Sequence, residues 1–302
     1  MTLPPSSFSS FEFAHDADWK ELSTFLDPFN STVTRTVVAR LRANNAAFAI
    51  IENDYVDRDF SADYSAFWSR LFRPYGRRTR RLHFFRVNLN DILERTPAEV
   101  SRGLEAVAAA GDYLGFIVQR PVPHAPIARA LLRPPLQTLR PPSTTERSAS
   151  AAELAQGTKT EGKPSDGIPP RLEVRADYEA HLLGASLRIR TVPFSQQDRS
   201  ISSCAQVSLW TCGRHFHNRH GAAWFSMPEI NAAALQQLDE VSAQSLPAGS
   251  GGIDLNGVLR ALRTLGQQPF PYIRLRIPME AGHSFRREAG QHSDLMSATI
   301  PR

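Results

Sequence analysis

Residues 193–210 read Pro193-Phe194-Ser195-Gln196-Gln197-Asp198-Arg199-Ser200-Ile201-Ser202-Ser203-Cys204-Ala205-Gln206-Val207-Ser208-Leu209-Trp210. They predict an extended segment, then a polar turn, then a helix that begins near Cys204. Ser202 and Ser203 are favoured N-cap residues. Val207, Leu209 and Trp210 are spaced as in a half-buried helix. The interpretation of the C-terminal half depends on this transition from strand to helix.

A cysteine in the first turn of a helix is a candidate nucleophile. The helix N-terminus carries a partial positive charge and unbonded N–H groups, and both stabilise a thiolate. A Gln upstream can fold back and direct its amide N–H toward the position where an oxyanion forms. Cys204 and Gln197 have this order in the chain. The competing interpretation is that Cys204 is a small core residue on an apolar helix face.

This constellation resembles the papain-like cysteine peptidases, in particular their bacterial peptide-processing branch. In that family a Gln precedes a Cys that opens a long helix, and a His and an Asn or Asp follow much later. The resemblance covers residues 186–270 and implies Gln197 as the oxyanion residue and Cys204 as the nucleophile. Gln197 lies one residue farther upstream than is usual. The next two helices of the family are matched by Ser226-Met227-Pro228-Glu229-Ile230 and by residues 252–266.

The general base is where the chain departs from the family. The family's His commonly follows a Gly, which implies His283 in Ala281-Gly282-His283-Ser284, with His292 and Asp294 as weaker alternatives. Residues 285–294 are polar and lack the apolar strand that would pack such a His. We therefore expect an incomplete antiparallel sheet. The resemblance implies a thiol hydrolase of peptide or isopeptide bonds whose activity is weak or lost, and the alternative is a catalytically inactive interaction module.

The rest of the chain predicts an α+β fold. Apolar spacing predicts helices over 16–26, 31–44, 61–72 and 97–110. Strands are expected over 46–51, 81–87, 113–121, 171–174 and 186–193. Glu52-Asn53-Asp54 is typical of a turn, and we expect a helix or turn near Tyr178.

Composition divides the chain into three parts. Residues 1–140 form a mixed helix and strand region with no recognisable chemistry. Residues 141–170 are rich in Pro, Ser and Thr, and such a segment buries too little apolar surface to offset its ordering entropy. We expect a linker there, followed by the papain-like region over 171–302.

Composition also restricts the compartment and the partners. The chain has 302 residues, of which 41% are hydrophobic, and no apolar run reaches the roughly 18 residues of a membrane span. Residues 1–13 lack the features of a secretory signal, and two cysteines make no disulfide framework. We expect a cytoplasmic protein that acts on a peptide or protein substrate. The sequence does not indicate the oligomeric state.

The net charge of +5 raises the possibility of nucleic-acid binding. The densest basic run, Arg77-Arg78-Thr79-Arg80-Arg81, has no interleaved aromatic residues of the kind that stack on bases. A preference for Arg at solvated positions accounts for the charge, and we do not expect a nucleic-acid partner.

Two clusters have the composition of metal sites. Asp54, Asp57, Asp59 and Asp63 lack the glycine and the late Glu of a common calcium loop. We interpret them as acidic residues that stabilise the start of a helix. Three histidines follow Cys212, but we interpret them as a solvated helix end; they are His215, His217 and His220. His83 lies between apolar strand residues and is expected to be a core or edge histidine whose hydrogen bonds are satisfied. We expect no metal and no cofactor.

Overall fold

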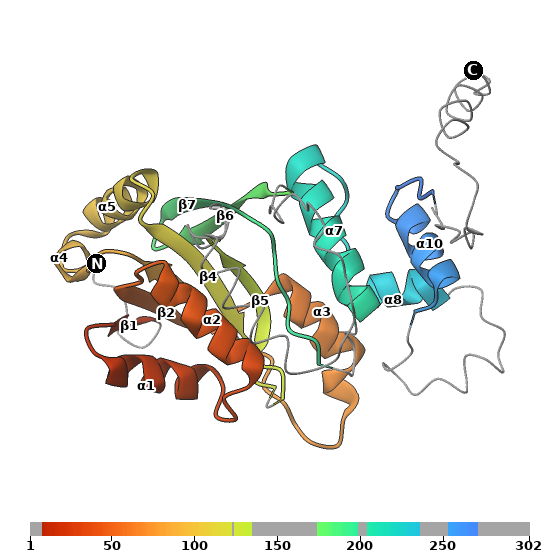
Figure 1. Cartoon of the computed structure of the whole chain (residues 1–302), viewed down its shortest axis with the longest axis horizontal. Helices are drawn as coiled ribbons and strands as arrows, with labels where there is room; N and C mark the ends of the chain where they lie inside the picture. The colour runs from red at the N-terminus through yellow and green to blue at the C-terminus, as the bar shows by residue number, and fades with distance from the viewer. Residues whose placement is uncertain (1–7, 123, 135–173, 199–203, 236–252, 271–302) are drawn as a thin grey trace, which may run out of the picture. The chain divides into compact units, whose positions relative to one another are not determined.

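The computed structural model describes residues 8–122, 124–134, 174–198, 204–235 and 253–270 (Figure 1). Within these ranges the fold is mixed α and β with two antiparallel sheets, as the sequence predicts. The elements described below all belong to one compact unit, Met1–Gln268. No helix in the described part of the chain is long and apolar enough to cross a membrane.

The larger sheet has five strands in the order β1-β2-β3-β4-β5, and every neighbouring pair is antiparallel. Its strands are β1 (Phe8–Glu12), β2 (Phe48–Tyr55), β3 (Thr79–Phe85), β4 (Tyr113–Gln119) and β5 (Ile127–Leu132). The register places His83 opposite Ile50 on one side and Phe116 on the other. Strand order follows chain order, so each strand lies beside its neighbour in the sequence.

Two helices, α1 (Asp16–Leu26) and α2 (Thr32–Ala43), cover one face of this sheet (Figure 1). The predicted boundaries of α2 are close to those observed: Ser31 is its N-cap and accepts a hydrogen bond from the Thr34 N–H at 3.3 Å. The helices bury one side each against alternate strand residues. This core contains Leu22, Leu26, Val37, Leu41, Ala49, Ile51, Leu82, Phe84, Leu114, Ile117, Ala130 and Leu132.

The opposite face packs against α5 (Pro97–Ala109) and a hairpin of β6 (Ala176–Leu182) and β7 (Ala185–Thr191). The short helix α4 (Asn90–Leu93) precedes α5. Leu183 and Gly184 make the hairpin turn with φ of 49° and 85°, the left-handed conformation that a two-residue turn between antiparallel strands requires. The second core includes Phe48, Ile50, Phe85, Val100, Leu104, Tyr113, Phe116, Val118, Leu131, Leu187 and Ile189.

Two local predictions are wrong. Glu52-Asn53-Asp54 lies within β2 and not in a turn, because Glu52 pairs with Phe8 of β1 and with Arg81 of β3. Tyr178 lies in β6, where every second residue is buried, and not in a helix or turn. In both places the pairing of neighbouring strands outweighs the local preference of the residues.

A third core joins the helices outside the sheet. These are α3 (Arg58–Ala66), the 3-10 helix η1 (Trp68–Arg70), α7 (Cys204–His220), α8 (Met227–Leu235) and α10 (Leu255–Thr264). The helix predicted over 61–72 begins earlier, because Asp57 caps it, and it ends as α3 at Ala66. The core contains Phe60, Trp68, Val122, Leu209, Trp210, Met227, Ile230, Ala233, Ala234, Ala261 and Leu265.

The predicted linker, 141–170, lies outside the described residues. The regions on either side of it share a core, since Leu187 and Ile189 of β7 pack with Val100 and Leu104 of α5. The hairpin that follows the linker therefore completes the packing of the N-terminal sheet.

Candidate functional site

Cys204 is the first residue of α7, and its side chain is exposed. Its thiol donates a hydrogen bond to Oε1 of Gln197, with a sulfur–oxygen distance of 3.4 Å. Residues 199–203, which include the expected N-cap residues, lie outside the described residues. The structure therefore brings together two of the three residues predicted for catalysis, at the end of the helix where a thiolate is stabilised.

The segment before Cys204 is attached to the edge of the large sheet. Phe194 exchanges two backbone hydrogen bonds with Ala130 of β5, at 2.8 and 2.9 Å. Farther along, the side-chain oxygen of Gln196 accepts from the Ile127 N–H at 3.0 Å, and the Gln196 N–H donates to the Ile127 carbonyl at 3.1 Å. The buried Arg120 also donates to the Gln196 carbonyl at 3.1 Å. These contacts hold the segment as an extended strand-like piece.

Extended backbone directs successive side chains to opposite sides. Gln196 is therefore buried against β5, whereas Gln197 is exposed and directed to Cys204. Asp198 is turned inward again, and its side chain forms an ion pair with Arg120 at 3.3 Å. The position of the Gln197 amide thus results from the anchoring of its two neighbours.

The base predicted for this site cannot be placed, because His283, His292 and Asp294 lie outside the described residues. Among the residues that are described, no hydrogen bond joins the Cys204 thiol to a histidine. The three histidines of α7 lie in its last two turns, at least about 16 Å from Cys204 along the helix axis. Of these, His217 donates from Nδ1 to the Ala222 carbonyl at 2.6 Å.

The acidic cluster, which has the composition of a metal site but not its pattern, makes contacts with arginine. Asp57 accepts from the Phe60 N–H at 2.9 Å and from Arg129 at 2.6 Å. Asp54 is exposed and lies 3.4 Å from Arg78. Within the described ranges no group of three or more His, Cys, Asp or Glu side chains is arranged to hold a metal ion.

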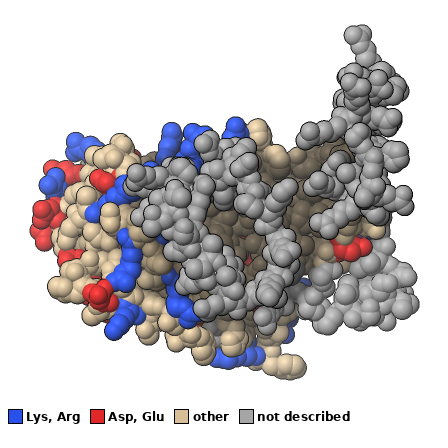
Figure 2. All heavy atoms as spheres, in the orientation of Figure 1, with Lys and Arg blue, Asp and Glu red and all other residues tan. Residues whose placement is uncertain are grey.

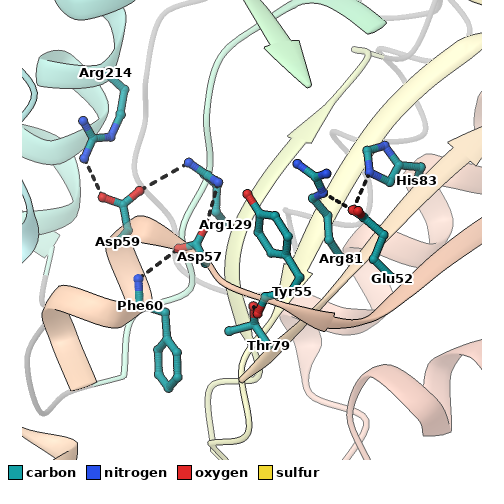
Figure 3. Close-up of polar contacts among 10 residues, drawn as sticks. All are labelled: Glu52, Tyr55, Asp57, Asp59, Phe60, Thr79, Arg81, His83, Arg129 and Arg214. Carbon is teal, nitrogen blue, oxygen red and sulfur yellow. Dashed lines mark hydrogen bonds and ion pairs between the residues drawn. The ribbon is translucent and has the colours of Figure 1, made fainter. Parts of the chain in front are cut away.

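Figure 3 shows that two members of this cluster, Asp57 and Asp59, are part of a buried charge network between three elements. Asp59 of α3 accepts from Arg214 of α7 at 2.5 Å and from Arg129 of β5 at 3.4 Å. Burial opposes the charge of Arg129, but the two nearby aspartates outweigh burial and raise its pKa. Burial lowers the pKa of Arg214 to about 10, so its guanidinium is still charged at neutral pH. The network fixes the middle of α7 against the sheet.

A second polar group lies on the same face of the sheet (Figure 3). His83 is fully buried, and burial lowers its pKa to about 4, so the imidazole is neutral at pH 7. Its Nδ1 lies 2.9 Å from the Tyr113 hydroxyl and its Nε2 lies 3.2 Å from the Glu52 carboxylate. Burial would raise the pKa of Glu52, but hydrogen bonds from His83 and Arg81 lower it. Nε2 is therefore the protonated nitrogen and Nδ1 accepts from Tyr113. The expectation of a core or edge histidine with satisfied hydrogen bonds is confirmed.

Another buried acidic residue, Asp63 of α3, interacts electrostatically with the Arg120–Asp198 ion pair. Burial raises the pKa of Asp63 to about 8, and Arg120 only partly counteracts this because Asp59 and Asp198 act in the same direction as burial. Asp63 is thus protonated over much of the neutral range. One proton can change the charge balance next to the segment that holds Gln197.

The sequence patterns did not predict the arginines that contact these acids: Arg120, Arg129 and Arg214. One signal was available for Arg129, since it is the only charged residue in the apolar run 127–132. A charged residue inside such a run is buried only when it is paired. The identity of its partner depends on the packing of α3 against the sheet, which no local pattern contains.

The basic surface gives no sign of a single binding patch on the face drawn in Figure 2. Where that face is formed by described residues, Lys and Arg atoms occur in several separate places, with acidic atoms among them at one end. Arg81, from the basic run, is buried and bonded to Glu52. The absence of a nucleic-acid partner stays a prediction.

Comparison of the chain with protein-family models, with curated proteins and with solved structures found no match.

Proposed function

We propose that this chain is a papain-like thiol hydrolase that acts on peptide or isopeptide bonds, with Cys204 as nucleophile and Gln197 as oxyanion donor. The observation that carries the proposal is the 3.4 Å contact between the Gln197 amide and the Cys204 sulfur at the first residue of α7. The reaction needs a nucleophile and a donor for the oxyanion, and this contact brings a candidate for each together.

In the proposed reaction the Cys204 thiolate attacks the carbonyl carbon of the substrate. The carbonyl oxygen becomes an oxyanion and accepts from N–H groups near the start of α7 and from the Gln197 amide nitrogen. Rotation of the terminal amide of Gln197 exchanges Oε1, which accepts from the thiol, for the N–H end that an anion requires. The C–N bond then breaks, and an acyl group remains on the sulfur.

A general base removes the thiol proton and later delivers a proton to the leaving amine. We assign this role to His283, on the resemblance alone. A water molecule then attacks the acyl-enzyme with loss of its proton to the same base, and the acid product leaves. The thiol is regenerated and no oxidant or cofactor is consumed.

Two features of the described residues support the proposal. The Gln197 side chain is directed to Cys204 by neighbours that are anchored on β5 and Arg120. A donor that is held in place before the reaction costs no reorganisation when the charge develops. Cys204 is also exposed, as a thiol that meets a polymeric substrate must be.

The test is acyl-enzyme formation with p-nitrophenyl acetate, a small activated ester that requires no knowledge of the natural substrate. We expect a burst of p-nitrophenol and acetylation of Cys204, detected by mass spectrometry. Cys204→Ala should abolish the burst, and Gln197→Ala should slow it by about 10²-fold, as the loss of one oxyanion donor does elsewhere. Cys212→Ala is the matched control and should behave as wild type.

The His283→Ala variant separates the proposed enzyme from the alternative module. Loss of the burst in His283→Ala would support the complete site. If wild type acetylates Cys204 no faster than Cys212, the chain is not a thiol hydrolase, and an inactive interaction module is the better interpretation.

A further inference from the structure

A pocket of about 110 Å³ lies where α7, the hairpin and the large sheet meet. Its hydrogen-bond donors come from strands, from α7 and from the loop after α7: Arg81, Arg129, Tyr178, Arg214 and Trp224. Glu179 of β6 and Asn218 of α7 also line the pocket. Phe116 and Leu131 contribute apolar surface from β4 and β5. Arg214 follows Cys204 by ten residues of the same helix, about 15 Å along its axis. The pocket is therefore separate from the thiol.

Several buried polar atoms that line this pocket have no hydrogen-bond partner among the described residues. The Tyr178 hydroxyl is one, on a residue that is 5% exposed, and Nε and Nη1 of Arg214 are two more, on a residue that is 2% exposed. Nε of Arg129 and Nε1 of Trp224 are also without a partner. Buried polar groups are almost always hydrogen-bonded, because an unmade bond costs about 1–3 kcal/mol.

Every one of these atoms can donate a hydrogen bond, and the guanidinium and indole atoms can only donate. The carboxylates of the network do not satisfy them. Arg214 uses Nη2 for Asp59 and for the Phe225 carbonyl, and Arg129 uses Nη1 and Nη2 for Asp59 and Asp57. The aspartates thus hold both guanidiniums in place through some of their nitrogen atoms. Nε of Arg129 and Nε and Nη1 of Arg214 are left to donate to a ligand in the pocket.

Contacts with neighbouring side chains orient these donors. Arg81 lies over the ring of Tyr55, 4.1 Å from its centroid, and its charge is paired with Glu52. Arg214 stacks on the Trp224 ring. Burial raises the pKa of Tyr178, although Arg214 acts in the opposite direction, so the hydroxyl is a neutral donor at pH 7. A group that enters the pocket meets donors from four residues that are already oriented.

We propose that this pocket binds the oxyanion group of a small molecule, either a carboxylate or a phosphoryl group. Donors from Tyr178, Arg129, Arg214 and Trp224 would surround its oxygens. Charged acceptors form shorter and stronger hydrogen bonds than neutral ones, so an oxyanion gains more from these donors than water does. The volume admits one such group, and Phe116 and Leu131 accommodate the apolar atoms attached to it. This proposal is independent of the hydrolase function.

The experiment is isothermal titration of the full chain, in separate arms, with inorganic phosphate and with acetate, at an ionic strength held constant with chloride. Intrinsic fluorescence provides a second readout, because Trp224 lines the pocket. We expect saturable binding of at least one probe, and the tighter of the two identifies the class of group. Tyr178→Phe should weaken that binding about tenfold or more, since it removes one hydrogen bond to a charged ligand.

Tyr178→Phe is the decisive variant because its hydroxyl has no partner to lose in the described part of the protein, so the fold should persist. Trp224→Phe removes another donor and should also weaken binding. Tyr64→Phe and Arg190→Gln remove a hydroxyl and a charge outside the pocket and should bind as wild type. Absence of saturable binding above that of chloride would overturn the proposal and leave water as the occupant. Equal binding by wild type and both pocket variants would overturn it as well.

Discussion

Arg214 in the middle of α7 donates a hydrogen bond to Asp59 in the first turn of α3, 155 residues earlier in the chain, at 2.5 Å. Arg129 of β5 contacts the other oxygen of the same carboxylate at 3.4 Å. This carboxylate therefore joins the five-stranded sheet, whose strands lie between Phe8 and Leu132, to the helix that carries Cys204. Removal of one partner from such a buried group leaves an uncompensated charge, which is costly.

We expect Asp57→Ala to be strongly destabilising. Asp57 is 1% exposed, caps α3 through the Phe60 N–H, and neutralises Arg129. Loss of a buried ion-pair partner costs about 3–5 kcal/mol. Asp54→Ala is the matched control: its side chain is 64% exposed, so its pair with Arg78 should contribute about 0.5 kcal/mol or less. Urea denaturation of both variants measures the difference, and equal losses would contradict the burial argument.

The raised pKa of Asp63 predicts that the protein loses stability as pH rises from about 4 to about 8. The folded-state pKa is about 8, against 3.8 for the unfolded chain. Between these values the native state holds a proton that the unfolded state has lost, so the free energy of unfolding falls as pH rises through this window. Each unit of pKa difference corresponds to about 1.4 kcal/mol.

Asp63→Asn removes this titration. From pH 5 to pH 9 we expect the free energy of unfolding of the wild type to fall by roughly 2 kcal/mol or more relative to that of Asp63→Asn. Urea denaturation at each pH measures this difference. Asp16→Asn is the control, since the Asp16 side chain is 85% exposed, and it should show the pH dependence of the wild type. Parallel pH profiles for wild type and Asp63→Asn would show that Asp63 is already ionised in the fold.

Replacing Gln196 and replacing its neighbour Gln197 should have different effects on the free energy of unfolding. Gln196→Ala leaves the buried Ile127 N–H without its acceptor and should cost about 1–3 kcal/mol of unfolding free energy. Gln197 is exposed, so Gln197→Ala should change stability by no more than about 0.5 kcal/mol. Thermal or urea denaturation distinguishes them. Comparable losses in both would mean that Gln197 is also a structural residue.

Cys204 should react with electrophiles before Cys212 does. Cys204 lies in the first turn of α7, where the helix dipole stabilises a thiolate, whereas burial raises the pKa of the Cys212 thiol. With limiting iodoacetamide near neutral pH, mass spectrometry should find Cys204 alkylated first. Both residues reach the surface, but the Cys212 thiol is partly buried, so access and position in the helix both favour Cys204. Earlier labelling of Cys212 would contradict the assignment of Cys204 as nucleophile.

Local signals predicted much of the secondary structure. The helix expected over 16–26 is α1 with the same bounds, and Cys204 begins α7 as expected. These elements have strong local determinants: an apolar stripe at helical spacing, N-capping residues, or a polar segment before an apolar run. The predictions for Glu52-Asn53-Asp54 and for Tyr178 were wrong because strand pairing decides the conformation of these residues. A local pattern does not show which strands pair.

The sequence by itself determined the α+β class, the start of α7 and the choice of Gln197 and Cys204 as a pair, because each depends on neighbours within a few turns or strand residues. Only the tertiary structure decided that Gln196 is buried and Gln197 is exposed, and that Asp57 and Asp59 meet arginines from β5 and α7. The pocket lined by Tyr178 and Arg214 also exists only in the fold. Ion pairs and pockets arise where elements far apart in the chain pack together, and a periodic pattern records that a side chain is buried but not which side chain it meets.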